Sequence, residues 1–295
     1  MAMYAAQILG KLTPEDFRIL IAIERGMSTY SYVPLNLIVK ISGLSFDDAV
    51  LHLSKIHSLK LILRRIGPYT GYRLNYNGYD VLALNVLSKR KSVEAIGGII
   101  AQGKESDIYE ALAPGGVKII AKFFRLGRTS FKQVKRTRFF IGSRRHTSWL
   151  YKSRLAALNE FKALEILYKH SFFTPKPIDS NRHVVIMSYI NGVPLYTVDE
   201  LENPAEVFGS IINNLRLALS IGLVHGDLSE YNIMLTPERL TYVIDWVQWV
   251  DVNHPNAHNL LKRDIKNITQ YFARKYGIRS DVGKIYDELR GVMKR

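Results

Sequence analysis

The chain has 295 residues, of which 47% are hydrophobic and 23% charged, and its formal net charge is +15. This length allows two domains with a core in each, and the absence of cysteine excludes disulfides, thiolate metal ligands and thiol chemistry. No apolar run approaches the ~20 residues of a membrane span, and residues 1–10 lack the features of a signal peptide, so we expect a cytoplasmic protein with no membrane partner.

Residues 1–90 predict a small helical domain with a hairpin. Thr13, Pro14 and Asp16 mark a helix start, because a capping threonine precedes a proline at the first helical position and an acid three residues after the cap. Two helices joined by a short glycine-containing turn, then a basic and aromatic hairpin, are typical of a winged helix-turn-helix. The predicted elements are helices over 13–26, 35–41, 46–58 and 78–88 and strands over 61–65 and 72–76.

A winged helix predicts contact with nucleic acid, although such domains also dock on proteins. The helix over 46–58, which would enter a groove, carries Asp47 and Asp48 with Lys55 as its only fixed positive charge. That charge suits a polyanionic duplex poorly. We therefore expect nucleic-acid contact to be made through the wing.

A strand pattern replaces the helical one after the basic run 88–92, which predicts a boundary between a winged-helix domain (1–90) and a second domain (91–295). Strands over 97–103, 107–112 and 117–124 predict an antiparallel sheet. Together with the helices this gives an α+β fold. We expect the second domain to have two lobes, divided at about residues 187 and 188.

The loop after the first of these strands resembles a Walker A loop but is one residue short of it. Glu105 stands where that loop has a serine or threonine for magnesium, and a strand follows in place of a helix. We instead predict a lid over phosphates, in which Gly103 permits close approach and Ser106 donates a hydrogen bond.

Lys122 ends an apolar strand and is a candidate to pair with phosphate. Such a lysine needs a carboxylate to hold it, and Glu160, on a helix predicted over 153–170, is the preferred candidate, with Glu165 as the alternative. Further along, a strand over 184–190 leads into a polar connector. The backbone of this strand at Met187, Tyr189 and Ile190 would suit a hinge that binds adenine.

The segment 118–154 has twelve Lys or Arg and no Asp or Glu. Aromatic residues lie between the charges, as is common on nucleic-acid surfaces. We favour an interaction surface over a solvated loop. The sign of the charge also favours a polyanionic partner.

The segment 225–232, which reads HGDLSEYN, and the later Asp245 carry the strongest chemical signal. Short strands over 233–235 and 240–244, around a turn at Pro237, predict a hairpin that returns Asn232 and Asp245 to the same end. Asn232 and Asp245 would offer the oxygen ligands that magnesium prefers. Asp227 would orient or deprotonate a nucleophile, so the pattern indicates phosphoryl transfer. Helices over 206–222, 256–276 and 280–294 complete the lower lobe.

With these residues in order, the chain resembles the RIO family of atypical serine/threonine protein kinases and ATPases, in its winged-helix-bearing type-2 branch. The resemblance covers almost the whole length. The loop that it places at the nucleotide consists of Gly103, Lys104, Glu105 and Ser106, and Lys122, Glu160, the HGDLSEYN loop and Asp245 follow in the family's order.

The resemblance implies a compact two-lobed kinase that uses ATP and Mg²⁺, with Mn²⁺ as an alternative ion. Asp227 would be the catalytic acid or base, Asn232 and Asp245 the metal ligands, and Lys122 the phosphate-binding lysine. Asp245 would accept the phosphoryl group as an aspartyl-phosphate. The implied partner is the pre-ribosomal small subunit, both rRNA and ribosomal proteins, and a monomer is favoured. The short C-terminus is similar to archaeal members.

Two residues depart from the family's usual pattern, namely Trp246, where phenylalanine is usual, and Ser188, where an acid is usual. Both bear on nucleotide preference. Trp246 also fits a small-molecule phosphotransferase of the aminoglycoside or choline kinase type. A third reading is a nucleic-acid-binding scaffold with an inactive kinase lobe.

Overall fold

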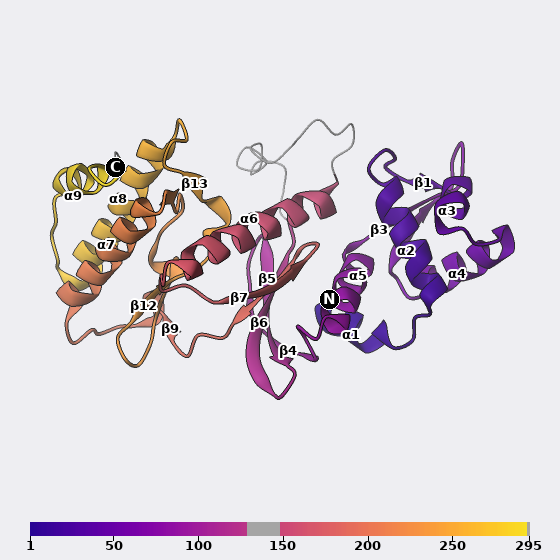
Figure 1. The fold of residues 1–295 in the computed structure, drawn as a ribbon, viewed down its shortest axis with the longest axis horizontal. Coiled ribbons are helices and arrows are strands. Elements are labelled where there is room, and N and C mark those ends of the chain that lie inside the picture. The colour runs from indigo at the N-terminus through magenta and orange to yellow at the C-terminus, as the bar shows by residue number, and fades with distance from the viewer. Residues whose placement is uncertain (129–147, 294–295) are drawn as a thin grey trace. The chain divides into compact units, whose positions relative to one another are not determined.

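The computed structural model describes residues 1–128 and 148–293, which form two compact units (Figure 1). The first unit comprises Met1–Leu158 and Ile178–Met187, and the second comprises Asn159–Pro177 and Ser188–Arg295. The two units are defined by contacts between residues, whereas the predicted domains, 1–90 and 91–295, are defined by a change in the sequence pattern. The predicted domain limits therefore stay a prediction. Residues 129–147 of the predicted basic segment lie outside the described residues.

The first unit begins with the winged helix, and its predicted helices and hairpin are confirmed. Thr13 and Asp16 form the reciprocal cap of α2, and Gly43 ends α3 in the left-handed region at φ 65°. The sequence pattern does not predict the short helix α1, because it has no capping side chain and no acid in its first turn. The elements are α1 (Ala2–Leu9), α2 (Pro14–Gly26), β1 (Val33–Pro34), α3 (Leu35–Ser42), α4 (Phe46–Ser58), β2 (Ile62–Arg65), β3 (Gly71–Leu74) and α5 (Tyr76–Lys89).

A five-stranded sheet of order β4-β5-β6-β8-β7 follows in the first unit. Its first three strands pair antiparallel, as predicted, with Glu110 opposite Ile120. Strand β7 was not predicted, because its sequence Pro-Ile-Asp-Ser-Asn lacks an apolar alternation. The strands are β4 (Ala95–Gln102), β5 (Ser106–Ala113), β6 (Val117–Phe124), β7 (Pro177–Asn181) and β8 (Val184–Ser188).

Helix α6 (Trp149–Lys169) runs from the first unit into the second. It begins four residues before the predicted start at residue 153, because the Ser148 hydroxyl accepts a hydrogen bond from the Tyr151 amide at 3.2 Å and so provides an earlier cap.

The winged helix and the sheet share one hydrophobic core inside the first unit. Buried side chains from α1 to α5 join buried side chains of β5, β6 and β8 in a single cluster. The winged helix is therefore packed onto the sheet as part of one folded body.

A buried ion network crosses this core and corrects part of the basic-surface prediction. Arg125 is fully buried, and its guanidinium donates to both carboxylate oxygens of Asp80 on α5 and to Asp107 at 3.2 Å. Arg128 forms a two-pronged pair with the same Asp107. Phe123 and Phe124 are buried as well. For Phe123, Phe124 and Arg125 the expectation of an exposed interaction surface is wrong, because the end of β6 and the residue after it lie in the core.

The second unit is mainly helical, with two small sheets. Strands β9, β11 and β12 form one antiparallel sheet, and β10 pairs with β13. The predicted helices are confirmed, and the last of them is shorter than expected. The elements are β9 (Val193–Pro194), α7 (Pro204–Ser220), β10 (Leu223–Val224), β11 (Ile233–Leu235), β12 (Thr241–Val243), β13 (Val250–Asp251), α8 (Ala257–Tyr276) and α9 (Val282–Arg290), with 3₁₀ turns Leu195–Thr197, Glu230–Asn232 and Trp246–Gln248.

Within the described ranges, no helix combines the length and apolar character that crossing a bilayer requires.

Candidate active site

The loop that carries Asp227 follows β10 and is held by an acid from α8. The carboxylate of Asp264 accepts the Gly226 amide at 2.7 Å and the Leu228 amide at 3.0 Å. Gly226 has φ 77°, and a Cβ there would lie 2.7 Å from the carbonyl oxygen of Gln248. Glycine is therefore required at this position, and the backbone on both sides of Asp227 is fixed.

Two more side chains from α8 complete this support. Arg263 donates to the carbonyl of Gly226, and the Asn267 amide donates to the carbonyl of Leu228 at 2.9 Å. Burial raises the pKa of Asp264 to about 7, against the opposing effect of the two backbone hydrogen bonds. Sequence reasoning missed Asp264, although an acid on the apolar face of α8, between Leu261 and Ile268, was a usable signal.

Asp227 itself presents its carboxylate at the surface of the second unit. Its side chain is 40% exposed, and one oxygen lies 3.6 Å from the Arg263 guanidinium. A carboxylate in this setting is accessible to a substrate hydroxyl or water and can act on its proton.

The predicted hairpin brings Asn232 and Asp245 to the same end and is confirmed. Ile233 pairs with Val243, and the Ile244 amide donates to the carbonyl of Asn232 at 2.9 Å. The side-chain amide of Asn232 donates to the carbonyl of Asp227 at 2.9 Å. Because its nitrogen is used in this way, its Oδ1 is the atom that can face a cation. The roles of Asn232 and Asp245 as metal ligands stay predictions.

Asp245 adopts an unusual backbone conformation. Its φ and ψ are 64° and 57°, in the left-handed region, and its side chain is exposed. A non-glycine residue in this region costs free energy, and such strain is concentrated at functional sites. The conformation separates the exposed carboxylate from the following Trp246, which is buried.

Trp246, the first departure from the family pattern, packs into the core beneath this end of the hairpin. Its indole nitrogen donates to the carbonyl of Val243 at 3.1 Å, and its ring centroid lies 4.6 Å from that of His225. Its role is therefore packing. Ser188, the second departure, exchanges two hydrogen bonds with the backbone of Lys176, both at 2.9 Å.

The first unit carries the predicted phosphate loop between β4 and β5. The Gly103 amide donates to the carbonyl of Ser106 at 2.8 Å, and the Arg125 amide donates to the carbonyl of Glu105 at 2.6 Å. Lys104 is exposed at the tip. Lys122 is 5% exposed on β6, with its ammonium 5.0 Å from the centroid of the Phe124 ring.

The remaining predicted residues are divided between the units. Met187 ends the first unit, whereas Tyr189, Ile190 and the buried Glu160 belong to the second. The pairing of Lys122 with Glu160 therefore stays a prediction, as does the hinge. What one unit brings together is Asp227, Asn232 and Asp245.

The described residues contain no group of three or more His, Cys, Asp or Glu side chains that could hold a metal. Magnesium does not need one, since it keeps several waters and binds through one or two protein ligands plus phosphate oxygens. One carboxylate and one amide oxygen fit that requirement.

Comparison with known protein families decides the relationship. The RIO domain family matches residues 107–285, and the family described as Rio2, N-terminal matches residues 9–90. The chain belongs to the RIO kinase family, in its Rio2 branch. Its winged helix and RIO domain agree with the predicted α+β architecture.

Individual Rio2 relatives are similar over most of this chain. The serine/threonine-protein kinase rio2 of Schizosaccharomyces pombe is 40% identical over 94% of this chain and 80% of its own length. The RIO-type serine/threonine-protein kinase Rio2 of Methanocaldococcus jannaschii is 37% identical over 89% of this chain and 99% of its own. The chain spans about half the length of the Dictyostelium discoideum relative, 51%, at 39% identity over 90% of this chain.

Solved structures of a Rio2 kinase share the fold. The Rio2 kinase-ADP/Mg²⁺-phosphoaspartate complex from Chaetomium thermophilum has a TM-score of 0.85 and 34% identity, covering 98% of this chain and 89% of that one. A second structure of the Rio2 kinase from the same organism has a TM-score of 0.83 and 36% identity, covering 97% and 87%.

Proposed function

We propose that this chain is an ATP- and Mg²⁺-dependent serine/threonine kinase and ATPase. The observation that carries the proposal is the placement of Asp227, Asn232 and Asp245 at one end of a hairpin in the second unit. The similar Rio2 kinase that forms an ADP/Mg²⁺-phosphoaspartate complex supports the same chemistry. ATP, with Mg²⁺ or Mn²⁺, would be held by these groups and by Lys122.

In this proposal each residue has a separate task. Asn232 and Asp245 would hold the magnesium ion, which supplies charge neutralisation on the phosphates. Lys122 and Ser106 would contact phosphate oxygens, and Glu160 would hold Lys122. Asp227 would orient the nucleophile and take its proton.

The ATPase branch would pass through Asp245. A carboxylate oxygen of Asp245 would attack the γ-phosphorus, and the bond from that phosphorus to the bridging oxygen would break as ADP leaves. Water would then hydrolyse the acyl-phosphate and restore the carboxylate. The left-handed backbone of Asp245 and the exposure of this residue support its use as an acceptor.

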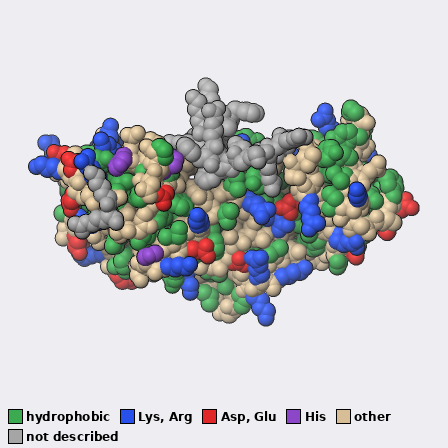
Figure 2. Space-filling model, turned by 45° about the horizontal axis from the view of Figure 1, so that its top comes forward, with side chains coloured by type: hydrophobic (Ala, Val, Ile, Leu, Met, Phe, Trp, Pro, Cys, Tyr) green, Lys and Arg blue, Asp and Glu red, His purple; other side chains and the backbone are tan. Residues whose placement is uncertain are grey.

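The proposed biological role is maturation of the small ribosomal subunit in the cytoplasm, with the chain acting as a monomer. The partner would be largely RNA, together with ribosomal proteins. The net charge of +15 and the spread of Lys and Arg side chains over the face in Figure 2 support a polyanionic partner. The wing and the basic segment 118–154 outside the buried network are the proposed contacts.

Incubation with γ-labelled ATP and Mg²⁺, followed by hydroxylamine, tests this function. We expect label on Asp245 that hydroxylamine removes, and we expect Asp227→Ala and Asp245→Ala to lower turnover by about 10³-fold or more. Asp287→Asn, an exposed acid on α9, is the control and should behave as wild type. Equal turnover in all four proteins would refute the proposal, and hydroxylamine-stable label would assign the protein-kinase branch.

A further inference from the structure

A pocket in the first unit, lined by none of the residues assigned to phosphoryl transfer, has the chemistry of a second nucleotide site. It has a volume of about 620 Å³ and lies between α2, α5, the start of α6 and the turn joining β7 to β8. This volume lies within the usual range of ligand pockets, about 300–1,000 Å³, and is large enough for a mononucleotide. Every residue that lines it belongs to the first unit.

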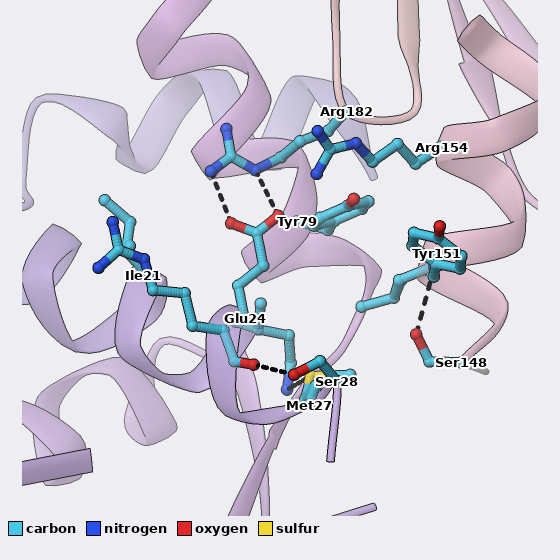
Figure 3. Close-up of a pocket in the computed structure, with 12 residues that line it drawn as sticks. Ile21, Glu24, Met27, Ser28, Tyr79, Ser148, Tyr151, Arg154 and Arg182 are labelled. Carbon is cyan, nitrogen blue, oxygen red and sulfur yellow. Dashed lines mark hydrogen bonds and ion pairs between the residues drawn. The ribbon is translucent and has the colours of Figure 1, made fainter. Parts of the chain in front are cut away.

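Positive charge converges on one side of this pocket. Figure 3 shows Arg154 and Arg182 reaching toward the same region beside Tyr79, and both guanidinium groups lie close enough to lower the pKa of the Tyr79 phenol. Arg154 is exposed and the side chain of Arg182 is 13% exposed, so an anion in this pocket would meet one guanidinium open to solvent and one that is mostly buried.

The pocket has too few acids to balance these charges. Glu24 is the only acid that lines it, and both of its carboxylate oxygens are used by Arg182, at 3.0 and 2.7 Å. Arg25 and Arg154 form no ion pair with any acid in the described part of the chain. The side chains that line the pocket, three arginines and one glutamate, therefore have a net charge of +2.

Tyr79 adds a hydrogen-bond donor at the same place. Burial is the main cause that raises its pKa, so the hydroxyl stays protonated and available to donate. Its ring stacks on His183 with centroids 4.7 Å apart, which fixes the direction of the phenol. Among described residues the hydroxyl has no hydrogen-bond partner.

The other walls suit a flat, weakly polar group. Leu74, Leu150 and Met27 are buried side chains at the pocket, and Tyr151, which is half-buried, lines it from α6 (Figure 3). Arginines beside aromatic rings are the combination by which proteins hold an unstacked nucleotide.

We propose that this pocket binds one nucleoside monophosphate unit. Its phosphate would be held by Arg154, Arg182 and the Tyr79 hydroxyl, and its base would pack against Tyr151. The unit is either a free nucleotide or one residue of single-stranded RNA, and the RNA source rests on the proposed function. Because the pocket is built by the winged helix and α6 together, its occupant contacts both.

Binding is measured with the phosphoryl-transfer site saturated by AMP-PNP and Mg²⁺, so that a second site is observed. The probes are UMP by calorimetry and a fluorescein-labelled pentauridylate by anisotropy. We expect Arg154→Glu to weaken binding about 10-fold or more and Tyr79→Phe, which keeps the ring, about 5-fold. Lys40→Glu, an exposed charge reversal on α3, should leave binding unchanged.

The two probes distinguish the sources. Binding of pentauridylate but not of UMP, lost in Arg154→Glu, supports an RNA residue, and binding of UMP with the same loss supports a free nucleotide. If the wild type binds neither UMP nor pentauridylate, the proposed site is refuted. It is also refuted if Arg154→Glu and Lys40→Glu weaken binding equally. ATP turnover is measured on the same proteins, so a wild type that binds pentauridylate without turnover would refute the proposed function and leave the pocket standing.

Discussion

At the scale of single residues, His183 should make the first unit sensitive to acid. The ring is fully buried, its Nε2 lies 2.8 Å from Asp80, and its Nδ1 has no hydrogen-bond partner among the described residues. Protonation would bury a second N–H without an acceptor, so burial lowers the pKa of His183 from 6.5 to about 4. The neutral ring is therefore the form that the fold requires.

The sign of the pH effect follows from these two pKa values. Below pH 6.5 the unfolded chain binds a proton at His183 that the folded chain does not, so its stabilising contribution is complete above pH 6.5 and is lost toward pH 4. Between pH 7 and pH 5 we expect a loss of about 2 kcal/mol in the free energy of unfolding. Denaturant titrations of wild type, His183→Gln and the exposed-site control His57→Gln measure it. An identical fall in wild type and His183→Gln would contradict this assignment.

Sequence reasoning at this scale found residues that stand in local patterns and missed those defined by distant partners. The hairpin around Pro237 could place Asn232 beside Asp245 because a turn and two strands determine their separation. Asp80 and Arg125 are 45 positions apart, and nothing local pairs them. An acid within the apolar run of α5 was the available signal, since such a residue is seldom buried without a partner.

At the scale of elements, the structure explains why the charge on α4 is poorly suited to binding nucleic acid. Lys55, the only lysine or arginine on this helix, lies 2.5 Å from the buried Asp16, and His52 is 2.7 Å from the same carboxylate. What α4 exposes includes Phe46 and Leu51, at 53% and 67%. The wing, by contrast, exposes Arg64 and Arg65 on β2.

We therefore expect nucleic-acid affinity to depend on the wing. The double variant Arg64→Glu, Arg65→Glu should weaken binding of a labelled 20-nucleotide RNA about 10-fold or more at low salt and reduce the slope of log K against log salt by about 1 to 2. Leu51→Ala on α4 is the comparison and should bind as wild type. A larger loss from Leu51→Ala than from the wing variant would assign the contact to α4.

Element boundaries were predictable wherever a cap or a glycine marks them. Thr13 and Gly43 delimit helices by chemistry that is visible in the sequence. Strand β7 and helix α1 lack such marks and owe their structure to neighbours, since β7 is an edge strand beside β8 and α1 buries Ala2, Ala5 and Ile8. Tertiary packing determines elements of this kind.

At the scale of the whole molecule, the buried network makes the winged helix and the sheet one folding unit. Asp80 comes from α5, Arg125 follows β6, and Asp107 lies at the start of β5, directly after the phosphate loop. Removing one member leaves the others charged and buried, which costs far more than the pair contributes to stability. The sequence pattern changes at residue 90 and carries no local sign of the core that α1–α5 share with β5, β6 and β8.

Asp80→Ala should therefore destabilise the first unit by about 3–5 kcal/mol. Arg90→Ala, which removes the 53% exposed partner of an ion pair with Asp179, should cost less than about 1 kcal/mol. Hydrogen exchange read by mass spectrometry measures where protection is lost. In Asp80→Ala we expect peptides from α2–α4 and from β4–β6 to lose protection together, because one core connects them. Loss confined to α5, with both flanking regions still protected, would show that the winged helix and the sheet fold separately.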